Sequence, residues 1–407
     1  MSSGLLKIGI IGGGVGGMTV ALALRKKKFD VEIFERLPFV DKAGAGIQIS
    51  PNGMRILRAI GLEKKIIEIG NVPSAIEFLD VRTNKLITNI PIGSNIFSEF
   101  GAGFYQIHRA DLITLLHQEL LTEGVKLKFG NKAVIGKTNS DSASLLFADN
   151  EKKFDLIIAA DGVGSKTRDV LFGEAKPLFL KQVAYRALIN ASLVPQEFQE
   201  NKTKVFLGSG FHAVSYPLRG HSIVNFVFCV DQDTWNNESW YNISNKRELL
   251  SSLPQVNALL PVIENLDSVN KWGLFGRSKL KSWSRGRVVL LGDACHPMLP
   301  YLAQGATQAI EDAWVLAEQL TSNGSQVLVG DKLDRYYRQR SIRAYRVQNI
   351  SARNRTIFHL RNPILRLVIF TSLRLLRFLF PNAVLIGFRW LYGGGPIPLK
   401  PSDGSST

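Results

Sequence analysis

Cysteine is scarce in this sequence, which has only Cys229 and Cys295 among its 407 residues. The two stand far apart with no partner spacing, so neither a disulfide framework nor a metal site is indicated. The apolar stretch from Leu5 to Ile11 is too short for a signal peptide and leads directly into glycines. These features together predict a reducing, cytoplasmic setting.

Long apolar runs are also missing. In the C-terminal part, the longest uncharged run extends from Phe378 to Phe388, which is 11 residues, and Pro381 interrupts it. A helix that crosses a bilayer needs about 20 apolar residues. We therefore expect no transmembrane segment.

Acidic residues are few relative to basic ones, and the formal net charge is +16. Residues 331–400 contain 14 lysines and arginines but only two acidic residues, Asp331 and Asp334, so this stretch holds 12 of the 16 excess charges. A basic segment of this kind is typical of contact with nucleic acid, anionic lipid or an acidic substrate. Nucleic acid is not expected as a partner, because the sequence has no recognition motif and no interleaving of aromatic with basic residues.

The chain opens with a βαβ pattern. A strand is predicted from Leu5 to Ile11, a helix from Met18 to Lys28, and a second strand from Asp30 to Phe34 that ends at Glu35. A G-x-G-x-x-G turn joins the first strand to the helix. Its residues include Gly12, Gly14, Val15 and Gly17.

The chemistry of a dinucleotide explains this spacing. Gly12 permits a tight turn, Gly14 lets the backbone approach a pyrophosphate, and Gly17 lets the helix pack close to the sheet. The N-terminus of the helix offers unpaired N–H groups and the positive end of its dipole to the phosphates. The carboxylate of Glu35 can accept hydrogen bonds from both ribose hydroxyls and disfavours a 2′-phosphate. The turn is therefore predicted to bind FAD or NAD, and not NADP.

Two later segments resemble buried strands that end in a glycine–aspartate pair. The first runs from Phe154 to Asp161-Gly162, and the second runs from Arg287 to Gly292-Asp293. A helix is predicted to start near Gln304-Gly305-Ala306 and to continue to about Leu320.

With these motifs in order, and with His108-Arg109-Ala110-Asp111-Leu112 between them, the sequence resembles the single-component flavoprotein aromatic hydroxylases, the family of salicylate hydroxylase and 3-hydroxybenzoate 6-hydroxylase. The resemblance covers nearly the whole chain. It implies an α/β fold, in which a Rossmann-like FAD-binding domain is interleaved with a mixed-sheet substrate domain and followed by a helical C-terminal part. Pro300 stands where some members with a meta-hydroxy acid substrate carry a polar residue, which argues against 3-hydroxybenzoate itself.

The resemblance also assigns residues to the FAD site. Asp293 would hydrogen-bond the ribityl hydroxyls, Arg109 would reach the FAD linker, and Asp161 would serve both FAD and the nicotinamide. The helix that starts near Gly305 would aim its dipole at the flavin and stabilise the anionic reduced form. Each aspartate has a plainer alternative as a helix cap or loop residue, and Arg109 has one as a surface residue. Further contacts are implied at Arg36, Gly46, Ile47, Val134 and Ala306.

The middle part, roughly from Phe172 to Trp283, is expected to form the sheet that covers the substrate over the flavin. His212, Val214 and Tyr216 share one face of a predicted strand, because alternate residues of a strand point the same way. In the family, a flavin hydroperoxide attacks the ring as an electrophile, and a phenolate reacts far better than a phenol. His212 is therefore the predicted base, and Tyr216 is predicted to hydrogen-bond the substrate. The alternative is a half-exposed histidine with no chemical role.

The sequence thus predicts an enzyme, an FAD-dependent monooxygenase that uses NAD(P)H and O2 to hydroxylate a small aromatic acid. NADH is favoured over NADPH as the transient co-substrate. A related monooxygenase with a non-phenolic or lipidic substrate, and a non-catalytic FAD-binding protein, stay open. The oligomeric state is open as well, with a homodimer as one option.

The chain divides into five parts. In the basic C-terminal part, arginines punctuate apolar runs, and two interpretations are open: a helix packed along the FAD lobe, or a helix in contact with a membrane surface. The predicted parts are FAD binding for 1–171, with a substrate-lobe insertion near 72–105, the substrate sheet for 172–283, FAD binding again for 284–330, the basic helical part for 331–400, and a disordered tail for 401–407.

Overall fold

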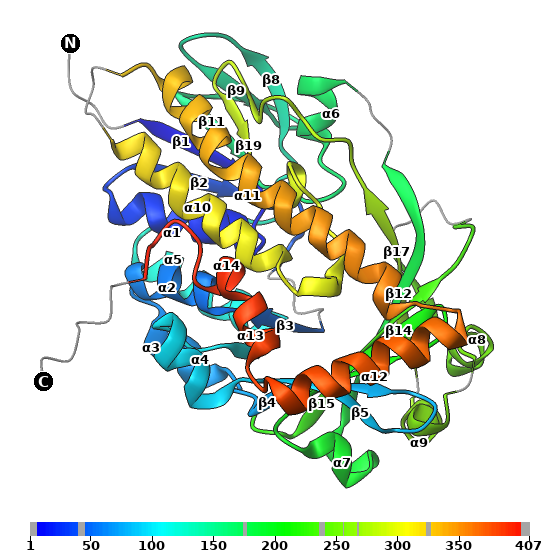
Figure 1. Ribbon diagram of the computed structural model, residues 1–407. Helices are drawn as coiled ribbons and strands as arrows, with labels where there is room; N and C mark the ends of the chain where they lie inside the picture. Colours follow the sequence, from blue (N-terminus) through cyan, green and yellow to red (C-terminus); the bar gives the residue numbers. More distant parts are fainter. Residues whose placement is uncertain are drawn as a thin grey trace, which may run out of the picture.

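The computed structural model describes residues 6–39, 45–173, 177–235, 241–254, 256–266, 268–322 and 327–399. The tail that was predicted to be disordered, residues 401–407, lies outside these ranges, as does Leu5. Two large sheets stand side by side, and helices cover them (Figure 1). No helix in the described ranges is both long and apolar enough to cross a membrane.

The first sheet is the Rossmann-like unit that the βαβ pattern predicts. Its strand order is β18-β19-β11-β1-β2-β7, and all neighbours except β18 and β19 are parallel. Helix α1 (Val15–Lys26) follows β1 and contacts the later helix α10 (Gly305–Thr321). The strands are β1 (Lys7–Ile11), β2 (Asp30–Phe34), β7 (Lys126–Lys128), β11 (Leu156–Ala159), β18 (Ser284–Arg285) and β19 (Val288–Leu290).

Smaller elements surround this sheet. Helices α2, α3 and α5 lie below α1 in Figure 1, and the hairpins of β8, β9 and β10 rise at its upper edge. Strand β3 pairs with β6 in a separate two-stranded sheet. The bounds are α2 (Pro51–Ala59), α3 (Glu63–Ile69), α4 (Gly93–Phe100), α5 (Arg109–Thr122), α6 (Lys166–Phe172), β3 (Gly46–Ile49), β6 (Tyr105–His108), β8 (Val134–Thr138), β9 (Ala143–Leu146) and β10 (Glu151–Phe154).

The second sheet is mixed and has eight strands in the order β16-β17-β12-β15-β14-β13-β4-β5. Strands β4 and β5 come from the first part of the chain, and β4 joins the sheet by a parallel pairing with β13. One face packs against the short helices α7, α8 and α9 in an apolar core. The elements are β4 (Ala75–Asp80), β5 (Leu86–Pro91), β12 (Leu178–Asn190), β13 (Thr203–Leu207), β14 (Phe211–Leu218), β15 (Ile223–Asp231), β16 (Tyr241–Ser244), β17 (Val269–Gly276), α7 (Gln196–Gln199), α8 (Lys246–Ser251) and α9 (Leu260–Ile263).

The C-terminal part is helical, as predicted, but only some of it packs on the FAD lobe. Helix α11 (Val329–Phe358) contacts α10 along the first sheet, whereas α12 (Pro363–Leu379) lies on β5 at the edge of the second sheet. Figure 1 shows α12 in the lower half of the molecule beside β5, followed by α13 (Ala383–Gly387) and α14 (Arg389–Tyr392). Of the two interpretations left open, packing along the FAD lobe applies to α11 and not to α12, which covers apolar residues of β5 such as Ile87 and Ile90 at the sheet edge.

Candidate functional site

The glycine turn after β1 has the geometry of a tight strand-to-helix connection. Gly12 has φ +102°, and a Cβ on it would collide with the carbonyl oxygen of Ala160. A Cβ on Gly17 would collide with the carbonyl oxygen of Gly12, so the helix can approach the strand only because Gly17 has no side chain. A Cβ on Gly14 would meet nothing within 4 Å, so this part of the turn borders open space.

Glu35 stands at the end of β2, where a ribose-binding acid was predicted. Its Oε2 accepts a hydrogen bond from the Gly13 N–H at 2.7 Å, and its Oε1 accepts one from the Leu37 N–H at 2.8 Å. The carboxylate is thus fixed against the glycine turn. Arg36 follows it and is exposed.

A cavity of about 510 Å³ lies between the glycine turn and the open face of the second sheet. It brings together residues that are far apart in the sequence. The predicted site residues that line it are Gly14, Val15, Gly46, Ile47, Arg109, His212, Tyr216, Asp293, Gly305 and Ala306. The predicted site residues outside the lining are Gly12, Gly17, Glu35, Arg36, Val134 and Asp161.

Asp293 and the start of α10 face this cavity from the first sheet. Asp293 is exposed to the cavity, and its carboxylate has no hydrogen-bond partner among the described residues. Desolvation by the protein that surrounds the carboxyl raises its pKa, although the side chain is exposed to the cavity. Helix α10 begins at Gly305 with no side-chain cap and no acidic residue in its first turn, so its N–H groups are available to a ligand.

Asp161 and Val134 lie away from the lining. The Asp161 Oδ2 accepts the Thr167 N–H at 3.1 Å at the start of α6, which is the capping role that was left open. The other oxygen, Oδ1, is buried and has no partner in the described ranges. Its neighbours Ala160 and Gly162 do line the cavity. Val134 begins β8 and is exposed.

The second sheet presents rows of side chains to the cavity. His212, Val214 and Tyr216 of β14 all line it, as strand alternation predicts. The pairing of strands places Arg186 beside Val227, which in turn stands beside Val214. Most of this wall is apolar, so its few polar groups decide how a ligand is oriented.

His212 is the first residue of a chain of hydrogen bonds that leads away from the cavity. Its Nδ1 lies 2.9 Å from the Nε2 of His359, and the Nδ1 of His359 lies 2.8 Å from the Oδ1 of Asp231. His212 and His359 are buried, whereas the Asp231 side chain is 17% exposed and also contacts Arg355 and Arg361. Sequence reasoning missed His359 and Asp231, because only the fold brings them to His212.

The protonation states in this chain follow from its geometry. A carboxylate only accepts hydrogen bonds, so His359 donates from Nδ1 and accepts at Nε2. His212 then donates from Nδ1, and its lone pair is on Nε2, which has no protein partner in the described part of the chain. Burial holds the pKa of His212 well below its ordinary value. His212 is therefore neutral at pH 7.

Tyr216 joins the second sheet to β3. A Cβ on Gly46 would collide with the Tyr216 ring, and the Gly46 N–H donates to the Oδ1 of Asn225 at 2.7 Å. The missing side chain at Gly46 thus creates room for the Tyr216 ring at the cavity. Burial raises the pKa of the Tyr216 hydroxyl, so the group is a neutral donor.

Arg186 is a second site residue that sequence reasoning missed. It lies on β12, lines the cavity, and has a buried Nε without a hydrogen-bond partner among the described residues. The Trp272 ring lies 5.3 Å from the guanidinium carbon, in the geometry of a cation–π contact. An arginine with an unused donor in an apolar cavity is suited to bind a carboxylate. Its position in a β-strand segment gave no local signal.

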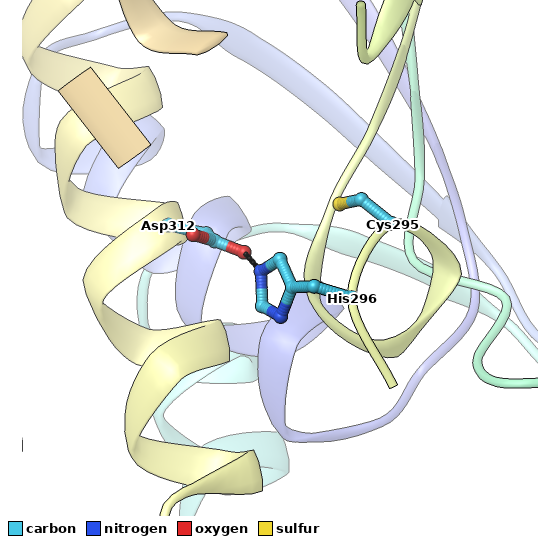
Figure 2. Close-up of side chains that lie close together, drawn as sticks. All are labelled: Cys295, His296 and Asp312. Carbon is cyan, nitrogen blue, oxygen red and sulfur yellow. Dashed lines mark hydrogen bonds and ion pairs between the residues drawn. The ribbon is translucent and has the colours of Figure 1, made fainter. Parts of the chain in front are cut away.

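Cys295, His296 and Asp312 form a buried cluster behind the cavity wall (Figure 2). The His296 Nε2 and the Gly292 N–H contact the Asp312 Oδ2 at 2.6 and 3.0 Å, and the Arg340 Nε donates to Oδ1 at 2.7 Å. Burial raises the pKa of the Cys295 thiol well above its usual range. Because the carboxylate is fully engaged and the thiol is protonated, these contacts favour a structural network over a metal site.

Comparison with known proteins places the chain among flavoproteins. The family described as FAD binding domain matches residues 6–351. A 3-amino-4-hydroxybenzoate 2-monooxygenase of Streptomyces platensis is 34% identical over 355 residues, which are 87% of this chain and 88% of that protein. A 6-hydroxynicotinate 3-monooxygenase of Bordetella bronchiseptica is 34% identical over 364 residues, which are 88% of this chain and 93% of that protein.

A solved structure shares the fold. The salicylate hydroxylase substrate complex matches 97% of this chain and 96% of its own, with a TM-score of 0.80 at 24% identity. The expected resemblance and the α/β fold class are both confirmed.

Proposed function

This chain belongs to the FAD binding domain family of flavoprotein monooxygenases, and we propose that it hydroxylates a small aromatic acid whose ring carries a hydroxyl group. The two relatives are named for substrates that combine a ring hydroxyl with a carboxylate. One observation carries the assignment to this chain. The cavity that borders the glycine turn also presents a neutral histidine, His212, and an arginine with an unused donor, Arg186.

The residues of the first sheet fit FAD. Gly14 borders open space, the carboxylate of Asp293 has no hydrogen-bond partner in the described part of the chain, and the N-terminus of α10 is uncapped. In our proposal, the glycine turn holds the pyrophosphate, Glu35 holds the adenosine ribose, and Asp293 accepts hydrogen bonds from the ribityl hydroxyls. The predicted contacts of Arg36, Ile47, Arg109, Val134 and Asp161 stay part of this proposal. Bound FAD would supply the activation of O2, for which the side chains have no chemistry.

His212 removes the phenolic proton in the proposed mechanism. The sequence-based expectation assumed a histidine pKa near neutrality, but burial lowers it well below 6.5, so the proton does not remain on His212. The hydrogen bonds from His212 to His359 and from His359 to Asp231 provide a route for the proton. As His212 accepts the proton at Nε2, it passes its own Nδ1 proton to His359 Nε2, and Asp231 stabilises the cation that results.

Asp231 is suited to its place at the end of the proton route that lies away from the cavity. Although burial acts in the opposite direction, its contacts with His359, Gln182 and Arg355 hold the pKa of the carboxyl below its ordinary value. It is therefore charged at neutral pH and stabilises a protonated His359. Its partial exposure lets the proton leave to solvent.

Arg186 and Tyr216 orient the substrate. The guanidinium binds the carboxylate of the ring, and the neutral hydroxyl of Tyr216 donates to an oxygen of the substrate. The apolar residues of the sheet exclude water from the ring. Together these contacts hold the ring in one orientation between the sheet and the FAD site.

The co-substrate and the compartment belong to the same proposal. We propose a reduced nicotinamide, with NADH favoured over NADPH, as a co-substrate that binds only transiently, because the sequence has no second G-x-G-x-x-G turn. We also propose a cytoplasmic location. It is supported by two buried cysteines that are not joined to each other.

The decisive experiment is substrate-stimulated oxidation of NADH or NADPH by the purified, FAD-loaded protein. We expect one noncovalent FAD per chain and faster oxidation with hydroxybenzoates, hydroxypyridine acids or kynurenine-like acids, with hydroxylated product detected. Matched acids without the ring hydroxyl should give no product. A protein that stays colourless after FAD addition, or that oxidises the nicotinamide equally with and without every acid, contradicts the proposal.

A further inference from the structure

The helix α12 exposes most of its apolar side chains, whereas its three arginines are half-buried. Of its 17 residues, only Phe370 is fully buried, while Ile364, Leu367, Leu375 and Phe378 are 70%, 66%, 56% and 81% exposed. Ten of the 25 large apolar side chains that are exposed among the described residues belong to the stretch 364–386. They are Ile364, Leu365, Leu367, Val368, Leu375, Leu376, Phe378, Leu379, Phe380 and Ile386, which we call the α12 apolar face.

The arginines of the same helix point toward the protein. Arg366 donates to the carbonyl oxygens of Leu207 and Leu360, and its guanidinium lies 4.9 Å from the Phe370 ring. Arg374 donates to the carbonyl oxygen of Leu86, and the Nε of Arg377 is buried. In an ordinary surface helix the polar face is outside. Here Arg366 and Arg374 bond to backbone carbonyls of the protein, Arg374 to one in the edge strand β5, and the apolar face is left without a covering element in the described ranges.

The surroundings of this face are positively charged. No acidic residue occurs anywhere from Arg335 to Lys400, a stretch with 13 lysines and arginines. Arg361, which pairs with Asp231, is 70% exposed just before α12 begins, and Arg82 and Lys85 are exposed in the turn between β4 and β5. This turn lies beside the helix, since Arg374 contacts the carbonyl of Leu86.

We propose that the α12 apolar face docks on the surface of a bilayer that contains anionic phospholipid. An amphipathic helix with a flanking basic rim lies in the plane of such a surface, with its apolar side chains among the acyl chains and its cations near the headgroups. A second copy of this chain is a poorer occupant, because it would bring two positively charged rims together. The helix lies on the surface and does not span the bilayer.

Vesicle flotation of the full-length, FAD-loaded protein tests this inference. We compare vesicles of pure phosphatidylcholine with vesicles of equal parts phosphatidylcholine and phosphatidylglycerol. The wild-type protein should float with the anionic vesicles and at least about tenfold less with the neutral ones, and added salt should weaken the binding. No flotation with anionic vesicles overturns the proposal.

The variant Leu367→Gln/Leu375→Gln/Phe378→Gln removes three exposed apolar side chains without touching the core. It should lose vesicle binding by at least about tenfold and keep its flavin absorbance and turnover. The matched control is Ile342→Gln, which changes a 78% exposed side chain on α11 and should bind vesicles like the wild type. If the triple variant floats like the wild type, the face is not a lipid contact. If instead it converts a dimer to a monomer by sedimentation, a second copy covers the face and the proposal is wrong.

Discussion

At the scale of single residues, His212 depends on partners that no local pattern reveals. We predict that His212→Ala keeps its flavin spectrum but lowers hydroxylated product per nicotinamide consumed, since loss of a positioned base costs about 100- to 10,000-fold in rate. Part of the yield should return as the pH rises from about 6 to about 9, because at higher pH the phenol ionises without a base. The measurement is product and hydrogen peroxide formed per NAD(P)H across this pH range.

A second variant distinguishes a catalytic base from a histidine with only a structural role. His359→Gln should slow the appearance of phenolate absorbance when substrate binds, and imidazole should restore part of the rate, because the outer route for the proton is broken. The control is His117→Ala, on α5 and outside the cavity lining, which should match the wild type. If His212→Ala matches the wild type at every pH, the base is another group.

Arg186 gives a prediction about recognition. Arg186→Gln should raise KM for the aromatic acid by about 10- to 100-fold, because a hydrogen bond to a charged group contributes about 1.5–3 kcal/mol. It should affect the corresponding phenol without a carboxylate much less. Steady-state kinetics with the acid and the phenol make the comparison. An equal rise in KM for both substrates would argue for a packing role.

Gly14 tests the cofactor turn. Because the space beside Gly14 is open, Gly14→Leu should fold but place its side chain where a pyrophosphate is proposed, and the purified protein should lack flavin absorbance. The thermal midpoint of the wild type should rise with added FAD, and that of the variant should not. Gly330→Leu, at an exposed glycine of α11, is the control and should stay yellow. A yellow Gly14→Leu protein would contradict the proposed position of the pyrophosphate.

At the scale of elements, a buried ionic network joins α10 to α11. Arg340 contacts Asp312 and Glu311, and Arg343 contacts Glu311 as well. Burial alone would raise the pKa of both carboxyls, but the contacts with His296 and Arg340 at Asp312, and with Arg340 and Arg343 at Glu311, lower them. Both acids are therefore charged in the folded state at neutral pH.

We predict that Arg340→Met destabilises the protein by about 3–5 kcal/mol at pH 7, because it leaves buried carboxylates without their partner. The difference from the wild type should shrink as pH falls below about 4, where protonation removes the uncompensated charge. Urea unfolding at several pH values measures it. Arg338→Met, at an exposed position of the same helix, should change stability by less than about 0.5 kcal/mol. Equal stability of the two variants would show that the network is not needed.

At the scale of the whole molecule, the C-terminal helices complete a core as well as carrying an exposed face. Phe370, Leu385 and Leu391 pack with residues of β5 and β13, and Arg55 of α2 donates to the carbonyls of Tyr392 and Gly394. Deletion of Leu365 to Leu391 should therefore give insoluble or unstable protein, measured as soluble yield and thermal midpoint. The triple glutamine variant of α12 should remain soluble. A soluble and active deletion would contradict the packing role, and if it also bound vesicles like the full-length protein it would contradict the docking role.

The sequence by itself determined the elements whose signals are local. The strand from Asp30 to Phe34, the glycine turn and the helix at Gly305 are where the pattern puts them. Alternation along β14 was enough to place His212 and Tyr216 on one face, because a strand fixes that relation without help from the rest of the fold.

Only the tertiary structure decided which distant groups meet. His359 lies 147 positions from His212. Arg186 lies on a strand whose residues face two environments. The local sequence therefore does not mark either residue as part of the site. The pattern of basic and apolar residues in α12 was visible in the sequence. The sequence did not show which face of the helix would be exposed. That choice depends on the tertiary structure, because backbone carbonyls of Leu86 on the edge strand β5 and of Leu207 on β13 accept hydrogen bonds from Arg374 and Arg366, and the leucines are left exposed.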